Sequence, residues 1–216
     1  MKENLTELVF ILDRSGSMSG LENDTIGGFN SMVDKQKKEK GEALVTTVLF
    51  DHEYEILHDR CSIHNMKSIT DKEYFVRGST ALLDAIGITI NKIGNVLSQE
   101  KEEERPNKVV FVIITDGMEN SSTEFSYNKI KKMIEHQKTK YSWDFMFLGA
   151  NIDAINTASK FGINEDRAVN FISDSEGTKL NYKVVSEAVS SFRQGNNVDE
   201  GWKLEIQQDF ENRRMK

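Results

Sequence analysis

The sequence predicts an α/β fold, a doubly wound and mainly parallel sheet with helices on both faces. Short apolar runs of strand length alternate along the chain with longer amphipathic segments. The runs are continuous rather than alternating, which is typical of strands that are covered on both faces. Strand–helix alternation implies right-handed crossovers, and in such sheets ligands bind beyond the carboxyl ends of the strands. Polar residues that follow the predicted strands are therefore candidates for a functional site.

Five segments have the length and composition of strands. Three are bounded by polar residues and are rich in β-branched or aromatic side chains: LVFIL (8–12), VVFVII (109–114) and FMFL (145–148). Two more, Ala43–Phe50 and Glu53–Ile63, are separated only by Asp51 and His52, the spacing of a two-residue hairpin. The second of this pair alternates more strongly between polar and apolar residues, so we predict an antiparallel strand at the edge of the sheet.

Helix patterns lie between these strands. The clearest repeats apolar residues every three or four positions from Leu82 to Leu97, with Ser79 or Thr80 at the predicted N-cap. Four further segments show helical spacing: 26–33, 130–134, 154–160 and 182–192. With one proline and no Gly/Ser linker, residues 1–195 are predicted to form a single domain. Residues 196–216 are less periodic, and both a tail helix and a partly disordered tail remain open.

Composition argues against several classes of protein. A formal net charge of −7 argues against general nucleic-acid binding, which needs basic surface to displace counterions. No apolar run approaches the roughly 18 residues that cross a bilayer, and the first residues lack the pattern of a signal peptide. The single cysteine, Cys61, cannot form an intramolecular disulfide, which fits a reducing compartment. We therefore predict a cytoplasmic protein that binds neither nucleic acid nor membranes.

Three polar clusters lie where this architecture places a site. Asp13, Ser15 and Ser17 follow the first strand, Thr80 precedes the long helix, and Asp116 ends a later strand. Two carboxylates and three hydroxyls, with no thiolate or imidazole, suit a hard divalent cation: Mg²⁺, with Mn²⁺ or Ca²⁺ as alternatives. Five protein oxygens leave one octahedral position open, and an acidic side chain of a partner protein is a natural ligand for it. The sequence thus predicts a metal site that recruits another protein.

Three fragments at these positions resemble elements of the von Willebrand factor A (VWA) family: DRSGSM (13–18), GSTALLDA (78–85) and TDGMEN (115–120). In that family they form the metal-ion-dependent adhesion site (MIDAS). The resemblance assigns its five coordinating positions to Asp13, Ser15, Ser17, Thr80 and Asp116. It covers roughly residues 6–192 and implies a VWA/Rossmann-like six-stranded sheet with one short antiparallel edge strand. FMFLGANIDA (145–154), followed by FGI (161–163), resembles intracellular bacterial or phage-type members rather than extracellular adhesion domains.

Each of the five residues also has a simpler interpretation when it is taken alone. Ser15 and Ser17 are typical turn and N-cap residues for the first helix, and Thr80 is a typical N-cap of the second. Asp116 is a typical turn former at a strand end. The same loops can cap helices and bind a cation, and the five residues together favour metal binding.

Residues next to the motifs receive separate predictions. Arg14 lies inside the first motif, and it would compete with a cation if its side chain folded over the metal position. Asp84, one turn after Thr80, either orients a loop of the site or caps backbone groups, and we favour the first role. Glu119 and Asn120 are predicted to be structural residues of their loop rather than metal ligands.

Other chemistry is less favoured. His52, His58 and His64 recur every six residues, which is not a metal-ligand spacing, so we predict exposed strand and loop histidines. Cys61 lacks the electropositive neighbourhood of a nucleophile apart from the adjoining arginine, and we predict a cysteine that either packs or is inert. A Mg²⁺-dependent phosphohydrolase of the haloacid-dehalogenase type needs a second aspartate where this chain has Ser15.

Our hypothesis from the sequence is therefore a metal-dependent protein-binding module of the adhesion or scaffold type, without catalytic residues. Two alternatives stay open. The first is the Mg²⁺-dependent phosphohydrolase, and the second is a scaffold subunit beside an ATPase with a vestigial metal site.

Overall fold

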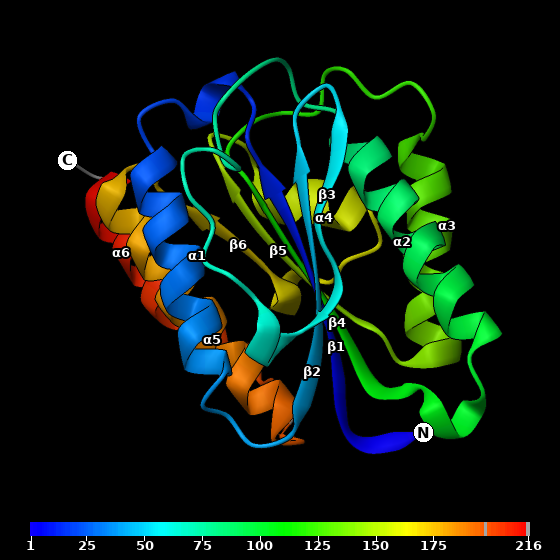
Figure 1. Ribbon diagram of the computed structural model, residues 1–216. Coiled ribbons are helices and arrows are strands. Elements are labelled where there is room, and N and C mark those ends of the chain that lie inside the picture. The colour runs from blue at the N-terminus through cyan, green and yellow to red at the C-terminus, as the bar shows by residue number, and fades with distance from the viewer. Residues whose placement is uncertain (197, 215–216) are drawn as a thin grey trace.

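The computed structural model describes residues 1–196 and 198–214 and arranges them around one sheet (Figure 1). Its strands are β1 (Lys2–Asp13), β2 (Glu42–Phe50), β3 (Tyr54–Ser62), β4 (Pro106–Thr115), β5 (Asp144–Ala150) and β6 (Ala168–Phe171). The strand order is β3-β2-β1-β4-β5-β6. Every neighbouring pair is parallel except β2–β3, which is antiparallel. The predicted fold class, with an antiparallel strand at one edge, is confirmed.

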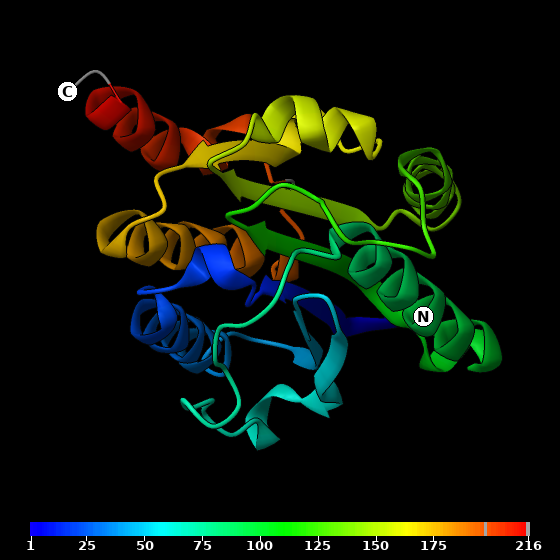
Figure 2. The ribbon, with the colours of Figure 1, turned by 90° about the horizontal axis from the view of Figure 1, so that it is seen from above.

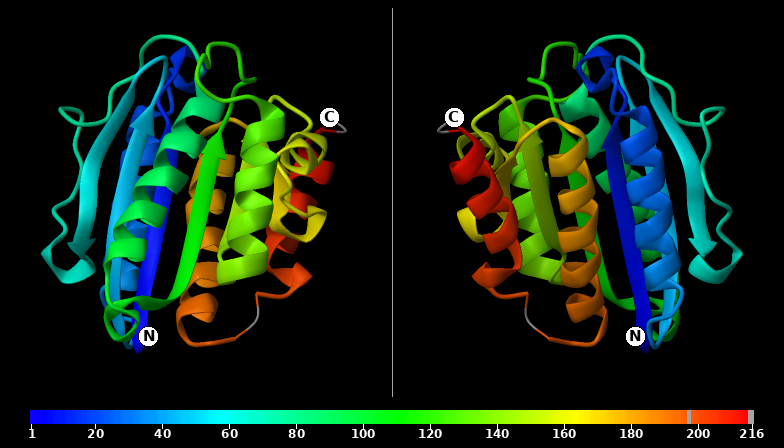
Figure 3. Two further views of the ribbon diagram at one scale, coloured as in Figure 1. Left: turned by 90° about the vertical axis from the view of Figure 1, so that its right-hand side faces the viewer. Right: turned by 90° about the vertical axis from the view of Figure 1, so that its left-hand side faces the viewer.

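Helices cover both faces of the sheet, as the view from above makes clear (Figure 2). One face carries α1 (Glu22–Gln36), α5 (Ser175–Arg193) and α6 (Leu204–Arg214). The other carries α2 (Leu82–Gln99), α3 (Tyr127–Tyr141) and α4 (Ala154–Lys160). Figure 3 shows each helix layer facing the viewer in turn. Short 3₁₀ turns complete the described chain: η1 (Gly16–Met18), η2 (Ile63–Asn65), η3 (Glu102–Glu104), η4 (Glu165–Arg167) and η5 (Glu200–Lys203).

The central strand β1 shows why its sequence reads as one continuous apolar run. Leu8, Phe10 and Leu12 pack in the core that also contains side chains of α1 and α5. Val9 and Ile11 pack in the opposite core, with side chains of α2 and α3. All five side chains are at most 1% exposed. Because both faces of the strand are covered by helices, no polar face remains to interrupt the run.

The hairpin and the last strand differ from their sequence patterns. The β2–β3 turn holds three residues rather than two, because the Asp51 N–H donates to the Glu53 carbonyl and the Asp51 carboxylate accepts the Glu53 N–H. The sixth strand, β6, has only four residues and was not located from the sequence. Its pairing with β5 completes the sheet on the side away from the hairpin.

The predicted N-caps of α1 and α2 are wrong. Four hydroxyl residues were candidates for these caps, and none of them occupies either position: Ser15, Ser17, Ser79 and Thr80. Leu21 precedes α1 and Ala81 precedes α2, and neither accepts a capping hydrogen bond through its side chain. Helix capping therefore does not account for these hydroxyl groups.

The C-terminal segment contains a helix that packs against the sheet. Ile206 of α6 is 1% exposed and belongs to the same core as α1 and α5. Trp202 Nε1 donates a hydrogen bond of 2.7 Å to the Asp166 carbonyl, and Lys203 Nζ donates one of 3.0 Å to the Ala168 carbonyl. Within the predicted tail, residues 197, 215 and 216 lie outside the described residues. Over 1–196 and 198–214, no helix is both long and apolar enough to cross a membrane.

Candidate functional site

Strand order brings two of the predicted site residues together. β1 and β4 are parallel neighbours, with Leu12 paired to Ile114, so Asp13 and Asp116 lie at the same carboxyl edge of the sheet. The chain continues from β1 to β2 on one side, and β4 lies on the other side. This reversal of strand order is where open α/β sheets bind their ligands.

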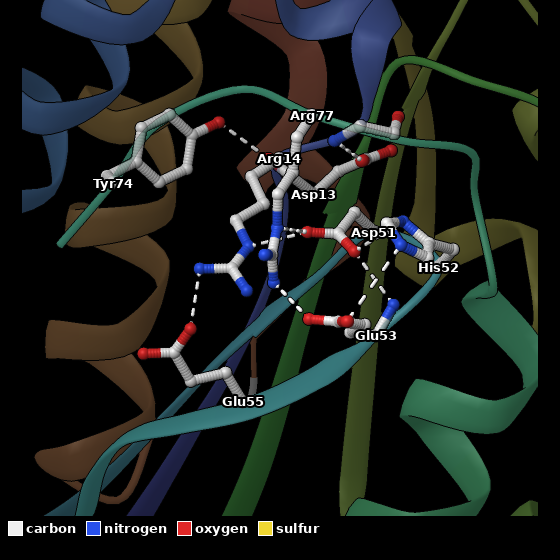
Figure 4. Close-up of polar contacts among 9 residues, drawn as sticks. Asp13, Arg14, Asp51, His52, Glu53, Glu55, Tyr74 and Arg77 are labelled. Atoms are coloured by element: carbon white, nitrogen blue, oxygen red, sulfur yellow. Dashed lines mark hydrogen bonds and ion pairs between the residues drawn. The ribbon is translucent and has the colours of Figure 1, made fainter.

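The Asp13 carboxylate is held by hydrogen bonds to both of its oxygens. Oδ1 accepts the Ser15 N–H at 2.7 Å, and Oδ2 accepts the Thr115 hydroxyl at 2.5 Å. The Tyr74 hydroxyl donates to the Asp13 backbone carbonyl at 2.6 Å (Figure 4). Asp13 is 1% exposed. The position of Asp13 is therefore set by three segments: the end of β4 through Thr115, the turn after β1 through Ser15, and the loop after β3 through Tyr74.

Asp116 is held in the same way, by two serine hydroxyls. Ser17 donates to Oδ1 at 2.5 Å, and Ser173, in the loop between β6 and α5, donates to Oδ2 at 3.0 Å. The Ser17 and Ser15 hydroxyl oxygens are 3.1 Å apart. Ser173 was not singled out from the sequence because it lies in no recognisable motif. Only the sheet topology, which puts the end of β6 at this same edge, could have suggested it.

Gly117 shows where the three predicted hydroxyls converge. A methyl group at this glycine would lie 3.0 Å from Ser17 Oγ, 3.2 Å from Thr80 Oγ1 and 3.9 Å from Ser15 Oγ. A side chain at Gly117 would therefore crowd the Ser17 and Thr80 hydroxyls, and glycine lets these hydroxyls approach the backbone closely. Together with the hydrogen bonds above, this brings all five sequence-predicted residues into one cluster.

The electrostatics of the two carboxylates favour a bound cation. Burial raises the pKa of Asp13 to about 6, although hydrogen bonds from Thr115 and Ser15 lower it, and the nearby Asp116 raises it further. Burial also raises the pKa of Asp116, again against hydrogen bonds that lower it. In the described part of the chain, neither carboxylate forms an ion pair with a lysine, arginine or histidine. A divalent cation would supply the missing positive charge, and an all-oxygen set of donors suits Mg²⁺.

The site has few acidic groups for a metal centre. Among the residues that the structure describes, no group of three or more His, Cys, Asp or Glu side chains is placed to hold a metal ion. The candidate site contains two carboxylates, so serine and threonine hydroxyls would have to provide the remaining protein ligands. That is the donor set predicted from the sequence.

The loop that follows β4 is fixed against the start of α2. Thr80 and Asn120 exchange two bonds, from the Thr80 N–H to Asn120 Oδ1 at 2.8 Å and from the Asn120 N–H to the Thr80 carbonyl at 3.0 Å. The Glu119 carboxylate accepts the N–H groups of Leu83, at the start of α2, and of Ser122. Glu119 and Asn120 therefore hold this loop, as expected.

Asp84, on α2, in turn binds the backbone of the loop that follows β4. Its carboxylate accepts three consecutive backbone N–H groups of the loop, from Thr123, Glu124 and Phe125, at 2.8–3.0 Å. Asp84 thus orients the loop after β4 by bonding its backbone.

Arg14 points away from the cluster (Figure 4). It is fully buried, with Nε 2.9 Å from Asp51 Oδ2 and a terminal guanidinium nitrogen 2.7 Å from Glu55 Oε2. Arg77 Nε donates to the same Asp51 oxygen at 2.8 Å. Burial tends to raise the pKa of Asp51, but hydrogen bonds from Arg77, the Glu53 backbone and Arg14 outweigh it and leave that pKa lowered. Arg14 is neutralised in this cluster and does not cover the candidate metal position.

The three histidines do not share one environment. His52 is exposed, with Nδ1 3.0 Å from Asp51 Oδ1, and His64 is exposed, as predicted. His58, on β3, is half-buried rather than exposed, and burial lowers its pKa although the charge of Glu73 raises it. Cys61 is a free, partly buried cysteine.

Comparisons with known proteins give structural likeness only. No protein-family model and no curated protein sequence matches the chain. Among solved structures, proximal thread matrix protein 1 from the mussel byssus is 17% identical, with a TM-score of 0.60 over 87% of this chain and 46% of its own. The same mussel protein with a zinc-occupied MIDAS motif is 16% identical, with a TM-score of 0.57 over 86% and 46%.

Two further structures are similar. A von Willebrand factor type A protein from Catenulispora acidiphila is 14% identical, with a TM-score of 0.58 over 88% of this chain and 43% of its own. Manganese-loaded TRAP protein from Plasmodium vivax is 14% identical, with a TM-score of 0.56 over 83% and 73%. The chain spans less than half the length of the mussel and Catenulispora proteins. At these identities the likeness establishes the fold, and the fold is that of a VWA domain.

Proposed function

We propose that the chain is a protein-binding module that acts through a divalent cation at the carboxyl edge of its sheet. Five residues would hold the cation, directly or through water: Asp13, Ser15, Ser17, Thr80 and Asp116. We propose Mg²⁺, with Mn²⁺ or Ca²⁺ as alternatives, because every donor is an oxygen. The observation that carries this proposal is the convergence of three hydroxyl oxygens around Gly117, next to two buried carboxylates.

The two carboxylates define what the bound ion would do. Together they neutralise a divalent charge, and the chain's five oxygens leave one of six positions for an outside ligand. The ion would supply an electrophilic centre that accepts an acidic side chain of a partner. The chain's own part is to keep Asp13 and Asp116 in place through Thr115, Ser15, Ser17 and Ser173.

Two structures of similar fold that carry metal ions support the proposed use of a metal. TRAP carries manganese, and the mussel protein carries zinc in its MIDAS motif. On this basis, and on the three sequence fragments, we propose that the chain is a VWA-family protein with an intact MIDAS. Its intracellular bacterial or phage-type character and its cytoplasmic location rest on the sequence alone.

We propose no catalytic role for the site. Ser15 stands where the phosphohydrolase alternative needs a second aspartate, and a serine hydroxyl is not an acid–base group at neutral pH without an adjacent base. Ser15 Oγ contacts Ser17 Oγ, and no histidine or lysine is bonded to it in the described residues. A metal-dependent binding role uses all five residues of the cluster, whereas hydrolysis would need an acid–base aspartate that the cluster does not contain at position 15.

A calorimetric titration with Mg²⁺ and with Mn²⁺ tests the metal site directly. We expect saturable binding to the wild type and a loss of affinity of about 100-fold or more in Asp13→Ala. Asp34→Ala, which removes an exposed carboxylate of α1, is the matched control and should bind metal like the wild type. Equal binding heats in the wild type and Asp13→Ala, or none in either, would remove the metal claim.

Two further measurements separate binding from the alternatives. Capture of a partner protein should disappear in EDTA and return with Mg²⁺, and capture that is unchanged by EDTA would contradict the mechanism. Turnover of a generic phosphoester that is lost in Asp13→Ala would instead favour the hydrolase. A site that binds no metal but keeps its partner would favour the scaffold with a vestigial site.

A further inference from the structure

Two of the largest exposed apolar side chains of the described chain lie on the loops that build the candidate site. Met118, directly after Gly117, is 71% exposed, and Phe75, in the loop that leads to Thr80, is 43% exposed. These loops meet above the ends of β1 and β4 (Figure 2). Single exposed apolar residues are common on proteins, so their position and rigidity have to decide what they mean.

The loop that presents Met118 is rigidly held. Asn120 is bonded to Thr80 on both its backbone and its side chain, and the Glu119 carboxylate accepts two backbone N–H groups of its own loop and one from α2. Asp84 accepts three more N–H groups farther along the loop. A partner that covers Met118 would therefore have little loop entropy to overcome.

Phe75 is fixed by a different kind of contact. The Arg14 and Arg77 guanidinium carbons lie 5.3 Å and 5.5 Å from the centre of its ring, within the range of cation–π attraction. Its loop is also bonded to the first metal-binding segment, through the Arg77 N–H to the Arg14 carbonyl and the Gly16 N–H to the Gly78 carbonyl. The ring thus lies at the surface, against two guanidinium groups.

Charge around the site restricts what could bind between these side chains. Arg14 and Arg77 are both paired with Asp51, and Arg77 also pairs with Glu53. Arg14 and Arg77 are therefore already neutralised and do not offer a free positive charge to a second acidic group. A bound cation would attract one carboxylate, and the groups flanking that carboxylate would meet apolar side chains.

We infer that Phe75 and Met118 form an apolar rim around the metal position, and that the partner is a protein segment whose acidic residue lies between apolar residues. This inference rests on the proposed function and specifies the partner of the same site. The glutamate or aspartate would complete the metal coordination, and the apolar neighbours would cover the rim. A partner whose acidic residue has polar or glycine neighbours would lose the second contact.

Capped, fluorescently labelled pentapeptides test the rim. One has glutamate between two leucines, and the other has glutamate between two glycines. With Mg²⁺-loaded wild type, fluorescence anisotropy should show at least about tenfold tighter binding of the leucine peptide, since covering one apolar side chain contributes about that factor. In Met118→Ser the ratio should fall towards one, and Met118→Leu should restore it. Phe75→Ala should lower the same ratio.

Matched controls keep the rim separate from the metal site. Leu204→Ala removes a side chain of α6 that is 52% exposed, and it should leave the peptide ratio unchanged. Calorimetry should give wild-type metal affinity for every rim variant, because Met118 and Phe75 donate nothing to the cation. The rim inference is wrong if metal-loaded wild type binds the two peptides with equal affinity. It is also wrong if the ratio of the two affinities is unchanged in both Met118→Ser and Phe75→Ala. Either result leaves the proposed metal site standing. Absence of metal binding in the wild type overturns the proposed function and the rim with it.

Discussion

At the scale of residues, Ser17 links the two halves of the candidate site. Its hydroxyl donates to Asp116 and lies 3.1 Å from the Ser15 hydroxyl. A hydroxyl has one hydrogen and two lone pairs, so donation to Asp116 leaves lone pairs that can face a cation. Asp13 is the other anchor, since Thr115 and the Ser15 backbone occupy its oxygens. Each carboxylate is thus positioned by hydroxyl or N–H donors rather than by a counter-ion.

The raised pKa of Asp13 predicts how metal binding depends on pH. Its pKa is about 6 in the metal-free protein, so a proton competes with the cation below that pH. Metal affinity should fall by up to about tenfold for each pH unit below 6 and level off above about pH 7. Calorimetric titrations at about pH 5 and about pH 7.5 measure this difference. Affinity that is equal at both values would contradict a buried carboxylate ligand.

The same shift has a consequence for stability. A carboxyl group whose pKa is higher in the folded than in the unfolded chain favours folding while it is protonated, and this contribution is lost as the pH rises through its folded pKa. Metal-free protein should therefore lose on the order of 2 kcal/mol of unfolding free energy between about pH 4 and pH 6 from Asp13. Asp13→Asn should remove that part of the pH dependence, and saturating metal should offset it above about pH 6.

At the scale of elements, the site depends on loops that cap one another. The loop after β4 supplies Glu119 to the start of α2, and α2 returns Asp84 to three N–H groups of that loop. Helix α2 therefore begins without a cap from its own preceding residues. This exchange fixes Thr80 relative to Gly117, which is why the hydroxyl of one loop can lie close to the backbone of the other.

Replacing Asp84 by alanine should weaken both the fold and the site. Three backbone N–H groups would lose a charged acceptor, and we expect a loss of roughly 1–3 kcal/mol in unfolding free energy, measured by urea denaturation. Metal affinity should fall as well, because the loop continues directly from Asp116. Asp199→Ala is the control, since Asp199 accepts one N–H, from Gly201, in η5. Wild-type metal affinity in Asp84→Ala would show that this loop does not position the site.

At the scale of the whole molecule, the order of the strands creates the site. Asp13 and Asp116 meet because β1 and β4 are neighbours, although a hundred residues and a hairpin separate them in the sequence. The C-terminal segment contributes at the other side of the sheet, where α6 covers part of the core and residues of η5 bond to β6 and η4. We propose that residues 1–195 and the described part of the tail unfold as one unit.

Ile206→Ala tests this proposal about the tail. Removing a side chain that is 1% exposed should cost about 2–5 kcal/mol of unfolding free energy while leaving a single transition. Leu204→Ala, two residues earlier on α6 and 52% exposed, should cost less than about 0.5 kcal/mol. Thermal and urea unfolding monitored by circular dichroism measure both variants. Two separate transitions, or equal small effects, would mean that α6 is not part of the cooperative core.

The sequence by itself determined the fold class, five of the strands and five helices, and it predicted the residues of the candidate site. These features leave local signals: runs that are apolar on both faces, helical spacing, and short motifs at the ends of the predicted strands. The fourth helix, Ala154–Lys160, has the bounds expected from its sequence. Where the signal was short or ambiguous, prediction failed, as with β6, which has only four residues, and with the three-residue turn of the hairpin.

Only the tertiary structure decided how the site residues are held and what surrounds them. Ser173 bonds to Asp116 from the loop between β6 and α5, and Arg14 turns towards Asp51 and Glu55. Three hydroxyls converge on Gly117, where no side chain stands in their way. None of these contacts can be read from a local sequence pattern, because each depends on which loops the sheet brings together at one edge. Strand pairing is a long-range outcome of packing, whereas a motif records only which residue types stand near one another in sequence.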